Sequence, residues 1–127
     1  MAWCFPDEAS DAADAVLVAL EGAKVWVPAV WSLEIANAVL TGERTKRVRQ
    51  PEIRRFITLL ESLPISQDTP PCTAQVSKVL PVAREYGLSA YDAAYLELSI
   101  RRDARLATLD AKLQTAARKA GIKIFGS

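Results

Sequence analysis

Three acidic residues, Glu34, Asp92 and Asp110, each stand in an otherwise apolar stretch of the chain. Clustered carboxylates repel one another unless a cation neutralises them, and oxygen ligands suit Mg²⁺ or Mn²⁺. An ion held in this way binds substrate phosphates and makes water nucleophilic. The three acids therefore suggest metal-dependent hydrolysis of a phosphodiester, provided that the fold brings them together.

The chain contains no histidine. This absence excludes a Ser-His-Asp triad, a Cys-His dyad, the histidine-containing zinc motifs and a ribonuclease with a histidine acid–base pair. Chemistry must depend on carboxylates, hydroxyls, Lys and Arg, or a metal held by oxygen. The two isolated cysteines, Cys4 and Cys72, fit a reducing cytosol.

Short apolar strands alternate with helices along the sequence. We predict strands at residues 25–27, 63–65, 105–109 and 122–125, and helices at residues 7–21, 30–40, 51–62, 73–86, 89–102 and 110–120. Pro81 is expected to kink or restart its helix, and Gly87 to end it. The alternation predicts an α/β class, a three-layer α/β/α fold with a short parallel sheet, in a single domain spanning residues 1–127.

The predicted elements place the three acids at one edge of that sheet. Glu34 lies early in the helix after the first predicted strand, Asp92 in the first turn of helix 89–102, and Asp110 directly after strand 105–109. Ligands of open parallel sheets bind at the carboxyl ends of the strands. We therefore expect the three carboxylates to converge there.

Each acid also has a purely structural interpretation. Ser89 and Asp92 have the spacing of a capping box, and Asp110 is a good N-cap. Glu34 near a helix start is favoured by the helix macrodipole. Ser89 itself has no neighbouring base and is better explained as a cap than as a nucleophile.

Positive charge is concentrated between two predicted helices, at Arg44, Lys46, Arg47 and Arg49. The stripe fits either a phosphate footprint or a solvated helix end and loop. Lys123 begins the last predicted strand and lies at the edge away from the acids. Aromatic side chains such as Trp26, Trp31, Tyr91 and Tyr95 suit either base stacking or a core.

The overall composition is that of a soluble globule: 127 residues, 50% hydrophobic and 24% charged, with net charge +1. The first twenty residues carry four acids and no base, unlike a secretory signal. The longest uncharged apolar stretch, residues 25–33, is far shorter than the ~18 residues of a membrane helix. We expect a cytoplasmic protein with no membrane association.

Three segments together resemble the PIN-domain ribonucleases of the VapC toxin type. They are Trp-Ser-Leu-Glu-Ile-Ala-Asn at residues 31–37, Gly-Leu-Ser-Ala-Tyr-Asp-Ala-Ala-Tyr-Leu at residues 87–96, and Ala-Thr-Leu-Asp-x-x-Leu at residues 107–113. Their order and spacing cover nearly the whole chain.

The resemblance implies an endoribonuclease that depends on Mg²⁺, with Mn²⁺ as the alternative metal. It also implies a homodimer that is neutralised by a cognate antitoxin in a type II toxin–antitoxin system. By similarity, Glu34, Asp92 and Asp110 would be the catalytic, metal-binding acids. Thr108 would support the last loop, and Asn37 would face the site.

One departure from the family pattern concerns the start of the chain. Members open with a hydrophobic strand that ends in an Asp, whereas residues 1–8 look like the segment that follows it. We therefore expect the first, central strand and its Asp to be missing. Either the start has been set too late or the protein is a degenerate member.

Three readings of function follow. The first is a metal-dependent ribonuclease toxin, impaired by loss of the first Asp. The second is a catalytically inactive PIN-like binding module that pairs with an antitoxin or with itself. A receiver-like domain would need a phospho-acceptor Asp on a central strand and a Lys at the same edge, and the sequence shows neither.

Overall fold

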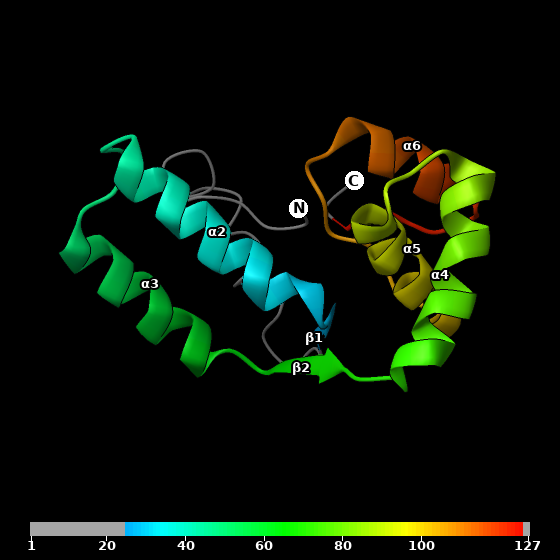
Figure 1. Cartoon of the computed structure of the whole chain (residues 1–127), viewed down its shortest axis with the longest axis horizontal. Coiled ribbons are helices and arrows are strands. Elements are labelled where there is room, and N and C mark those ends of the chain that lie inside the picture. The colour runs from blue at the N-terminus through cyan, green and yellow to red at the C-terminus, as the bar shows by residue number, and fades with distance from the viewer. Residues whose placement is uncertain (1–24, 126–127) are drawn as a thin grey trace.

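A computed structural model of the chain describes residues 25–125, so the predicted helix at residues 7–21 lies outside the described residues. The elements are β1 (Val25–Pro28), α2 (Val30–Arg44), α3 (Gln50–Ser62), β2 (Ile65–Asp68), α4 (Cys72–Tyr86), α5 (Ala90–Arg102) and α6 (Ala111–Lys119). Helices α2 and α3 lie on one side of the two strands, and α4, α5 and α6 on the other (Figure 1). The α/β class and its parallel sheet are confirmed.

Strands β1 and β2 form a parallel pair, with Val25 opposite Ile65 and Pro28 opposite Asp68. Parallel strands need a crossover connection, which the α2–α3 hairpin supplies. The strand predicted at residues 63–65 is wrong in its position, because β2 begins only after Pro64. Proline has no N–H to donate to a sheet, so Pro64 contributes only its carbonyl, which accepts from the Val25 N–H at 3.4 Å.

The predicted strands at residues 105–109 and 122–125 are wrong in extent. A single parallel bridge joins Leu106 to Ile124. The chain leaves the ladder after Leu106 because Thr108 makes local hydrogen bonds around the start of α6 instead. Among the hydrogen bonds of residues 25–125, none joins this bridge to β1. Residues 1–24 are not described, so the missing central strand stays a prediction.

Helix boundaries agree closely with the sequence signals. Pro51 stands in the first turn of α3, and the Glu52 carboxylate accepts from the Arg49 N–H at 3.3 Å. Gly87 ends α4 with a φ of 63°, a left-handed conformation that suits glycine. Pro81 does not restart α4, which continues through it. Helix α2 runs on past its predicted end to Arg44, because its last turns close in helical hydrogen bonds that reach Thr45.

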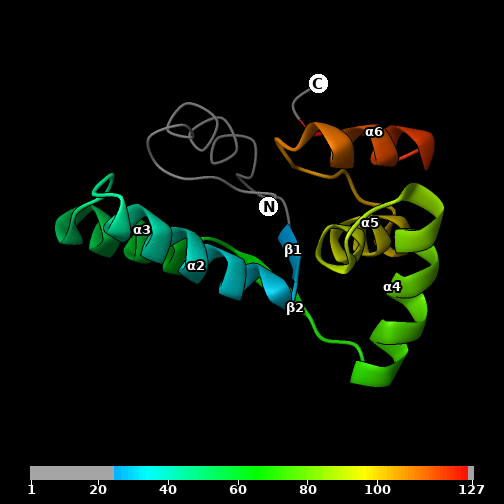
Figure 2. The same cartoon turned by 45° about the horizontal axis from the view of Figure 1, so that its top comes forward.

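The main core surrounds α5, in which residues 93–99 are all buried. Leu96 of α5 and Leu113 of α6 are completely buried, and Figure 2 shows α5 enclosed between β1, α4 and α6. A helix that is buried on most sides is a rigid base for side chains projecting from its first turns. No helix within residues 25–125 is long and apolar enough to cross a membrane.

Candidate functional site

A hydrogen bond between α2 and α5 defines the candidate site. The Tyr95 hydroxyl of α5 donates to the Glu34 carboxylate of α2. Tyr95 is only 4% exposed, and its burial, reinforced by the charge of Glu34, raises the pKa of its phenol. Tyr95 therefore stays protonated over the physiological range and acts as a fixed donor that orients Glu34.

Asp92 lies one helical turn before Tyr95, on the same side of α5. Its charge also contributes to the raised pKa of Tyr95, so two of the three predicted acids act on one phenol. The Ser89 hydroxyl accepts from the Asp92 N–H at 3.1 Å. The reciprocal bond of a capping box, from the Ser89 N–H to the Asp92 carboxylate, is absent among the hydrogen bonds of residues 25–125. The capping interpretation therefore explains Ser89 but leaves the Asp92 carboxylate free for another role.

Asp110 begins α6 and caps it through a single carboxylate oxygen. Its Oδ1 accepts from the N–H groups of Lys112 at 2.8 Å and Leu113 at 3.1 Å. The buried Thr108 hydroxyl accepts from the Asp110 N–H at 3.1 Å, while Gln114 donates to the Thr108 carbonyl at 2.8 Å. These bonds fix the loop before α6. Oδ2 of Asp110 accepts no hydrogen bond from the described residues.

Each of the three acids keeps at least one carboxylate oxygen that accepts no hydrogen bond from residues 25–125: Oε2 of Glu34, both oxygens of Asp92 and Oδ2 of Asp110. Such oxygens suit a hard divalent cation. Residues 25–125 contain no group of three His, Cys, Asp or Glu side chains that could hold a metal ion. The Tyr95 hydroxyl thus links Glu34 to the helix that carries Asp92. The gathering of the three acids at one metal site stays a prediction.

The remaining predicted residues lie farther along α2 and in the turn after it. Asn37 is exposed one turn beyond Glu34, and its carbonyl accepts from the Thr41 hydroxyl at 3.0 Å. The basic stripe is exposed in the last turn of α2 and the turn leading to α3, and its four members are Arg44, Lys46, Arg47 and Arg49. None of the four forms an ion pair with a described residue, so the stripe is open to solvent or a ligand.

Sequence reasoning missed an ionic cluster that joins β2 to α5. Asp68 is 7% exposed, and the guanidinium of Arg101 donates to both of its carboxylate oxygens, at 3.1 and 2.6 Å. Arg102 donates to Asp68 at 2.9 Å, and the buried Glu97 binds Arg101 at 2.9 Å. The hydrogen bond from Arg101 holds the pKa of Asp68 below its usual range. An acid and an Arg four residues apart in a buried helix were the only signal in the sequence.

The Arg102 guanidinium also lies 3.5 Å from the centre of the Trp26 ring in β1. This cation–π contact covers one face of the indole. Trp26 is therefore part of the packing between β1 and α5 rather than a free platform for a nucleic-acid base. The ionic cluster and Trp26 together fix both strands to α5.

The chain matches a known protein family over most of its length. A model of the PIN domain matches residues 1–119. The chain belongs to the PIN domain family. PIN domains have a nuclease fold and are typically metal-dependent nucleases that act on RNA. No curated protein and no solved structure matches the chain.

Membership in the PIN family bears on the two acids Glu34 and Asp92, because carboxylates are the ligands that divalent metals prefer. A nuclease fold that generally uses divalent metals needs oxygen donors held in place by the protein. In this PIN domain, Tyr95 binds the Glu34 carboxylate, and the first turn of α5 carries Asp92.

Proposed function

We propose that this PIN domain is a Mg²⁺-dependent endoribonuclease, with Glu34, Asp92 and Asp110 as its metal-binding and catalytic acids and Mn²⁺ as a workable substitute. The observation that carries the proposal is the hydroxyl of buried Tyr95, which holds Glu34 against α5, one helical turn from Asp92 on the same side of that helix. A structural acid at a helix start needs no such partner on another helix.

In this proposal, several residues of the chain hold the three acids in position. Tyr95 orients Glu34, and the Ser89 cap sets the first turn of α5 from which Asp92 projects. The capping bond through Oδ1 holds Asp110 while leaving Oδ2 available as a ligand. A divalent ion bound to such carboxylates neutralises phosphate charge and lowers the pKa of a bound water.

We further propose a VapC-type toxin role, with a homodimer in the cytoplasm and a cognate antitoxin that neutralises it. The three motifs shared with that type support this reading. Each acid also has an exposed apolar neighbour: Leu33 is 70%, Tyr91 64% and Leu109 58% exposed. Exposed apolar side chains beside functional groups are typical of protein interaction surfaces.

Cleavage of RNA by the Asp92→Asn variant tests the nuclease proposal. An amide cannot supply the charge that holds a divalent ion, so we expect metal-dependent cleavage to be abolished. Asp103→Asn is the matched control, because Asp103 is an exposed acid at the other end of the same helix, with a φ of 51° that asparagine tolerates. Unchanged Mg²⁺-dependent cleavage by Asp92→Asn would contradict the assignment.

A catalytically inactive binding module is the second candidate function. The observation in its favour is that residues 25–125 contain no group of three His, Cys, Asp or Glu side chains that could hold a metal ion. A purified wild-type chain that associates with itself in sedimentation experiments, yet cleaves no RNA with Mg²⁺ or Mn²⁺, would favour this reading. Cleavage that depends on both the metal and Asp92 would exclude it.

A further inference from the structure

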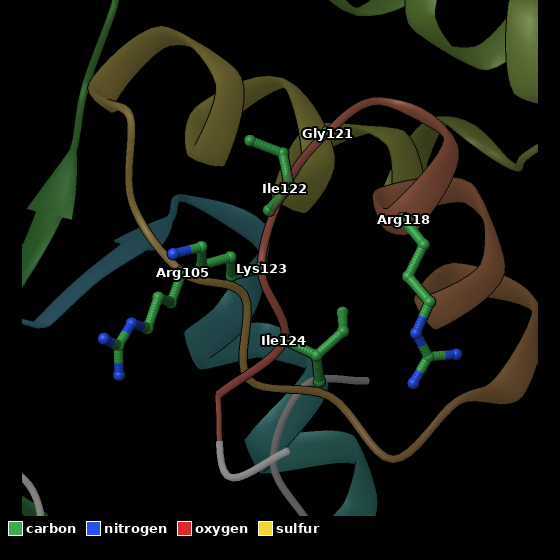
Figure 3. Close-up of a pocket in the computed structure, with 6 residues that line it drawn as sticks. All are labelled: Arg105, Arg118, Gly121, Ile122, Lys123 and Ile124. Atoms are coloured by element: carbon green, nitrogen blue, oxygen red, sulfur yellow. The ribbon is translucent and has the colours of Figure 1, made fainter.

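A pocket of about 590 Å³ opens beside the turn that follows α6. It is lined by Arg105, Arg118, Gly121, Ile122, Lys123 and Ile124. Every charged residue in this lining is a cation, and no acid contributes to it (Figure 3). Such a lining favours a negatively charged ligand.

Two of the cations are placed side by side by the parallel bridge. The Leu106 N–H donates to the Lys123 carbonyl at 3.0 Å, and the Phe125 N–H donates to the Leu106 carbonyl at 2.9 Å. The side chains of Leu106 and Ile124 are buried in the core. Because side chains alternate along an extended chain, Arg105 and Lys123 both project to the opposite, exposed face.

The third cation is placed by the end of α6. Arg118 lies in the last turn, and Gly121 reverses the chain with a φ of 79°. The Ile122 N–H donates to the Ala117 carbonyl at 2.8 Å and closes the turn. Figure 3 shows Arg118 across the segment of residues 122–124 from Arg105 and Lys123.

None of these three cations forms an ion pair with a residue in the described part of the chain. The contrast is with Arg101 and Arg102, which are both bound to Asp68. The pocket cations are also exposed, so a ligand can reach them. Their spread along a segment, rather than around one point, suits a chain of successive phosphates more than a single anion.

We propose that Arg105, Arg118 and Lys123 bind backbone phosphates of single-stranded RNA at a site separate from the acids. The inference rests on the proposed nuclease function for its choice of RNA as the anion. Asp110 caps the start of α6, whereas Arg118 lies in its last turn, so this pocket cation and Asp110 lie at opposite ends of the helix. The RNA must extend beyond the scissile bond to reach the pocket.

The test compares wild type with a triple variant, Arg105→Gln, Arg118→Gln and Lys123→Gln. Binding of a long fluorescent single-stranded RNA is measured without divalent metal over a range of salt concentrations. Loss of three phosphate contacts should reduce the magnitude of the slope of log binding constant against log salt concentration by about 2. Binding at low salt should weaken about tenfold or more. Thermal melting shows whether the variant is folded.

A matched control replaces three other exposed cations, Arg54, Arg55 and Lys78, by Gln. This change removes the same charge from α3 and α4, and we expect a smaller change in slope than for the pocket variant. An equal loss in both variants, or none in the pocket variant, overturns the proposal. If the triple variant does not fold, the double variant Arg105→Gln and Lys123→Gln replaces it, with an expected fall of about 1.4 in the slope.

Two further measurements separate this proposal from its alternatives. If the pocket variant loses binding to polyglutamate but keeps binding to RNA, the pocket serves an acidic protein and the proposal is wrong. A wild type that binds RNA through the pocket yet cleaves nothing with Mg²⁺ or Mn²⁺ contradicts the nuclease function alone. Normal cleavage of a short RNA by the pocket variant, with weakened binding of the long RNA, supports both.

Discussion

At the scale of single residues, the arrangement around Tyr95 distinguishes Glu34 and Asp92 from ordinary helix-start acids. A buried phenol that donates to a carboxylate restricts the carboxylate to one orientation, whereas an exposed Glu samples many. Metal ligands must be held close to their binding geometry, so this restriction favours ion binding. Under the proposed function, Tyr95 is a positioning residue that orients Glu34 and is not itself a ligand.

The Tyr95→Phe variant tests this positioning role. Phenylalanine fills the same space but cannot donate to Glu34, so we expect several-fold more Mg²⁺ to be required for half-maximal cleavage. The loss of unfolding free energy should be about 1 kcal/mol, the usual contribution of one hydrogen bond. Mg²⁺ titrations of cleavage, together with urea denaturation, provide the measurement.

Tyr86→Phe serves as the control for that variant. Tyr86 is half-buried at the end of α4 and packs against the same core, but forms no hydrogen bond through its hydroxyl within the described residues. We expect its Mg²⁺ requirement to match wild type. The same Mg²⁺ requirement in Tyr95→Phe as in wild type would show that the bond to Glu34 has only a structural role.

The local roles of residues were predictable from sequence where a local signal exists. The caps at Ser89 and Asp110 follow from residue type and the helical pattern, and both form. The role of Tyr95 was not predictable, because the sequence of α5 does not reveal which residue of α2 packs against it. The sequence favoured a core position for Tyr95 over base stacking, and the core position is confirmed, but its bond to Glu34 had no signal in the sequence.

At the scale of elements, the ionic cluster is what attaches β2 to α5. Asp68 ends β2, and Arg101 lies in the last turn of α5. The hydrogen bond from Arg101 lowers the pKa of Asp68, so the folded state binds fewer protons than the unfolded state in acid. The stabilisation is therefore complete above the ordinary carboxyl pKa of about 3.9 and is lost as the pH falls through the lower folded value.

The Asp68→Asn variant should lose this stabilisation at every pH. We expect its unfolding free energy at about pH 7 to be lower than that of wild type by about 1–3 kcal/mol, because the buried position 68 loses the charge that binds Arg101 and Arg102. The difference should narrow as the pH falls toward about 3, because Asp68 of the unfolded wild-type chain then binds protons more readily than folded Asp68 and this favours unfolding. Urea denaturation at both pH values measures it, with Asp103→Asn as the exposed control. A difference that stays constant with pH would contradict the ionic explanation.

Helices were predicted more accurately than strands, and the reason is physical. Helices α3, α4, α5 and α6 carry their signals locally, in Pro51, Gly87, Ser89 and Asp110. A strand exists only where a partner pairs with it. Leu106 and Ile124 lie in the two short segments predicted as strands, yet only one bridge forms between these segments. Their apolar character predicted burial correctly, but not the length of the ladder.

At the scale of the whole molecule, positive charge is presented at two distant places. The basic stripe lies at the tip of the α2–α3 hairpin, and the pocket cations lie near α6, at opposite ends of the molecule (Figure 1). An RNA strand that contacts both must pass along the body of the protein between them. The total charge of the chain, +1, does not reveal these two separate groups of positive charge.

Substitution of Arg44 and Arg47 by Gln tests whether the stripe contacts RNA. Two lost phosphate contacts should flatten the salt dependence of binding by about 1.4 and weaken binding to every RNA sequence alike. Salt titrations with two unrelated RNAs provide the measurement, and Arg54→Gln with Arg55→Gln is the control on α3. An unchanged slope would show that the stripe is only a solvated turn.

The pairing of β1 with β2 also has a consequence for how the chain folds. Val25 pairs with Ile65, 40 positions later, and the intervening chain must first be brought back on itself. Closing a long segment costs conformational entropy before any strand contact repays it, so non-local parallel pairing is slow. The α4–α5 hairpin, by contrast, joins neighbouring segments through the short turn at Gly87 and forms from local contacts. We expect α4 and α5 to dock early and the two strands to associate late, with Asp68 meeting Arg101 only in the last stage of folding.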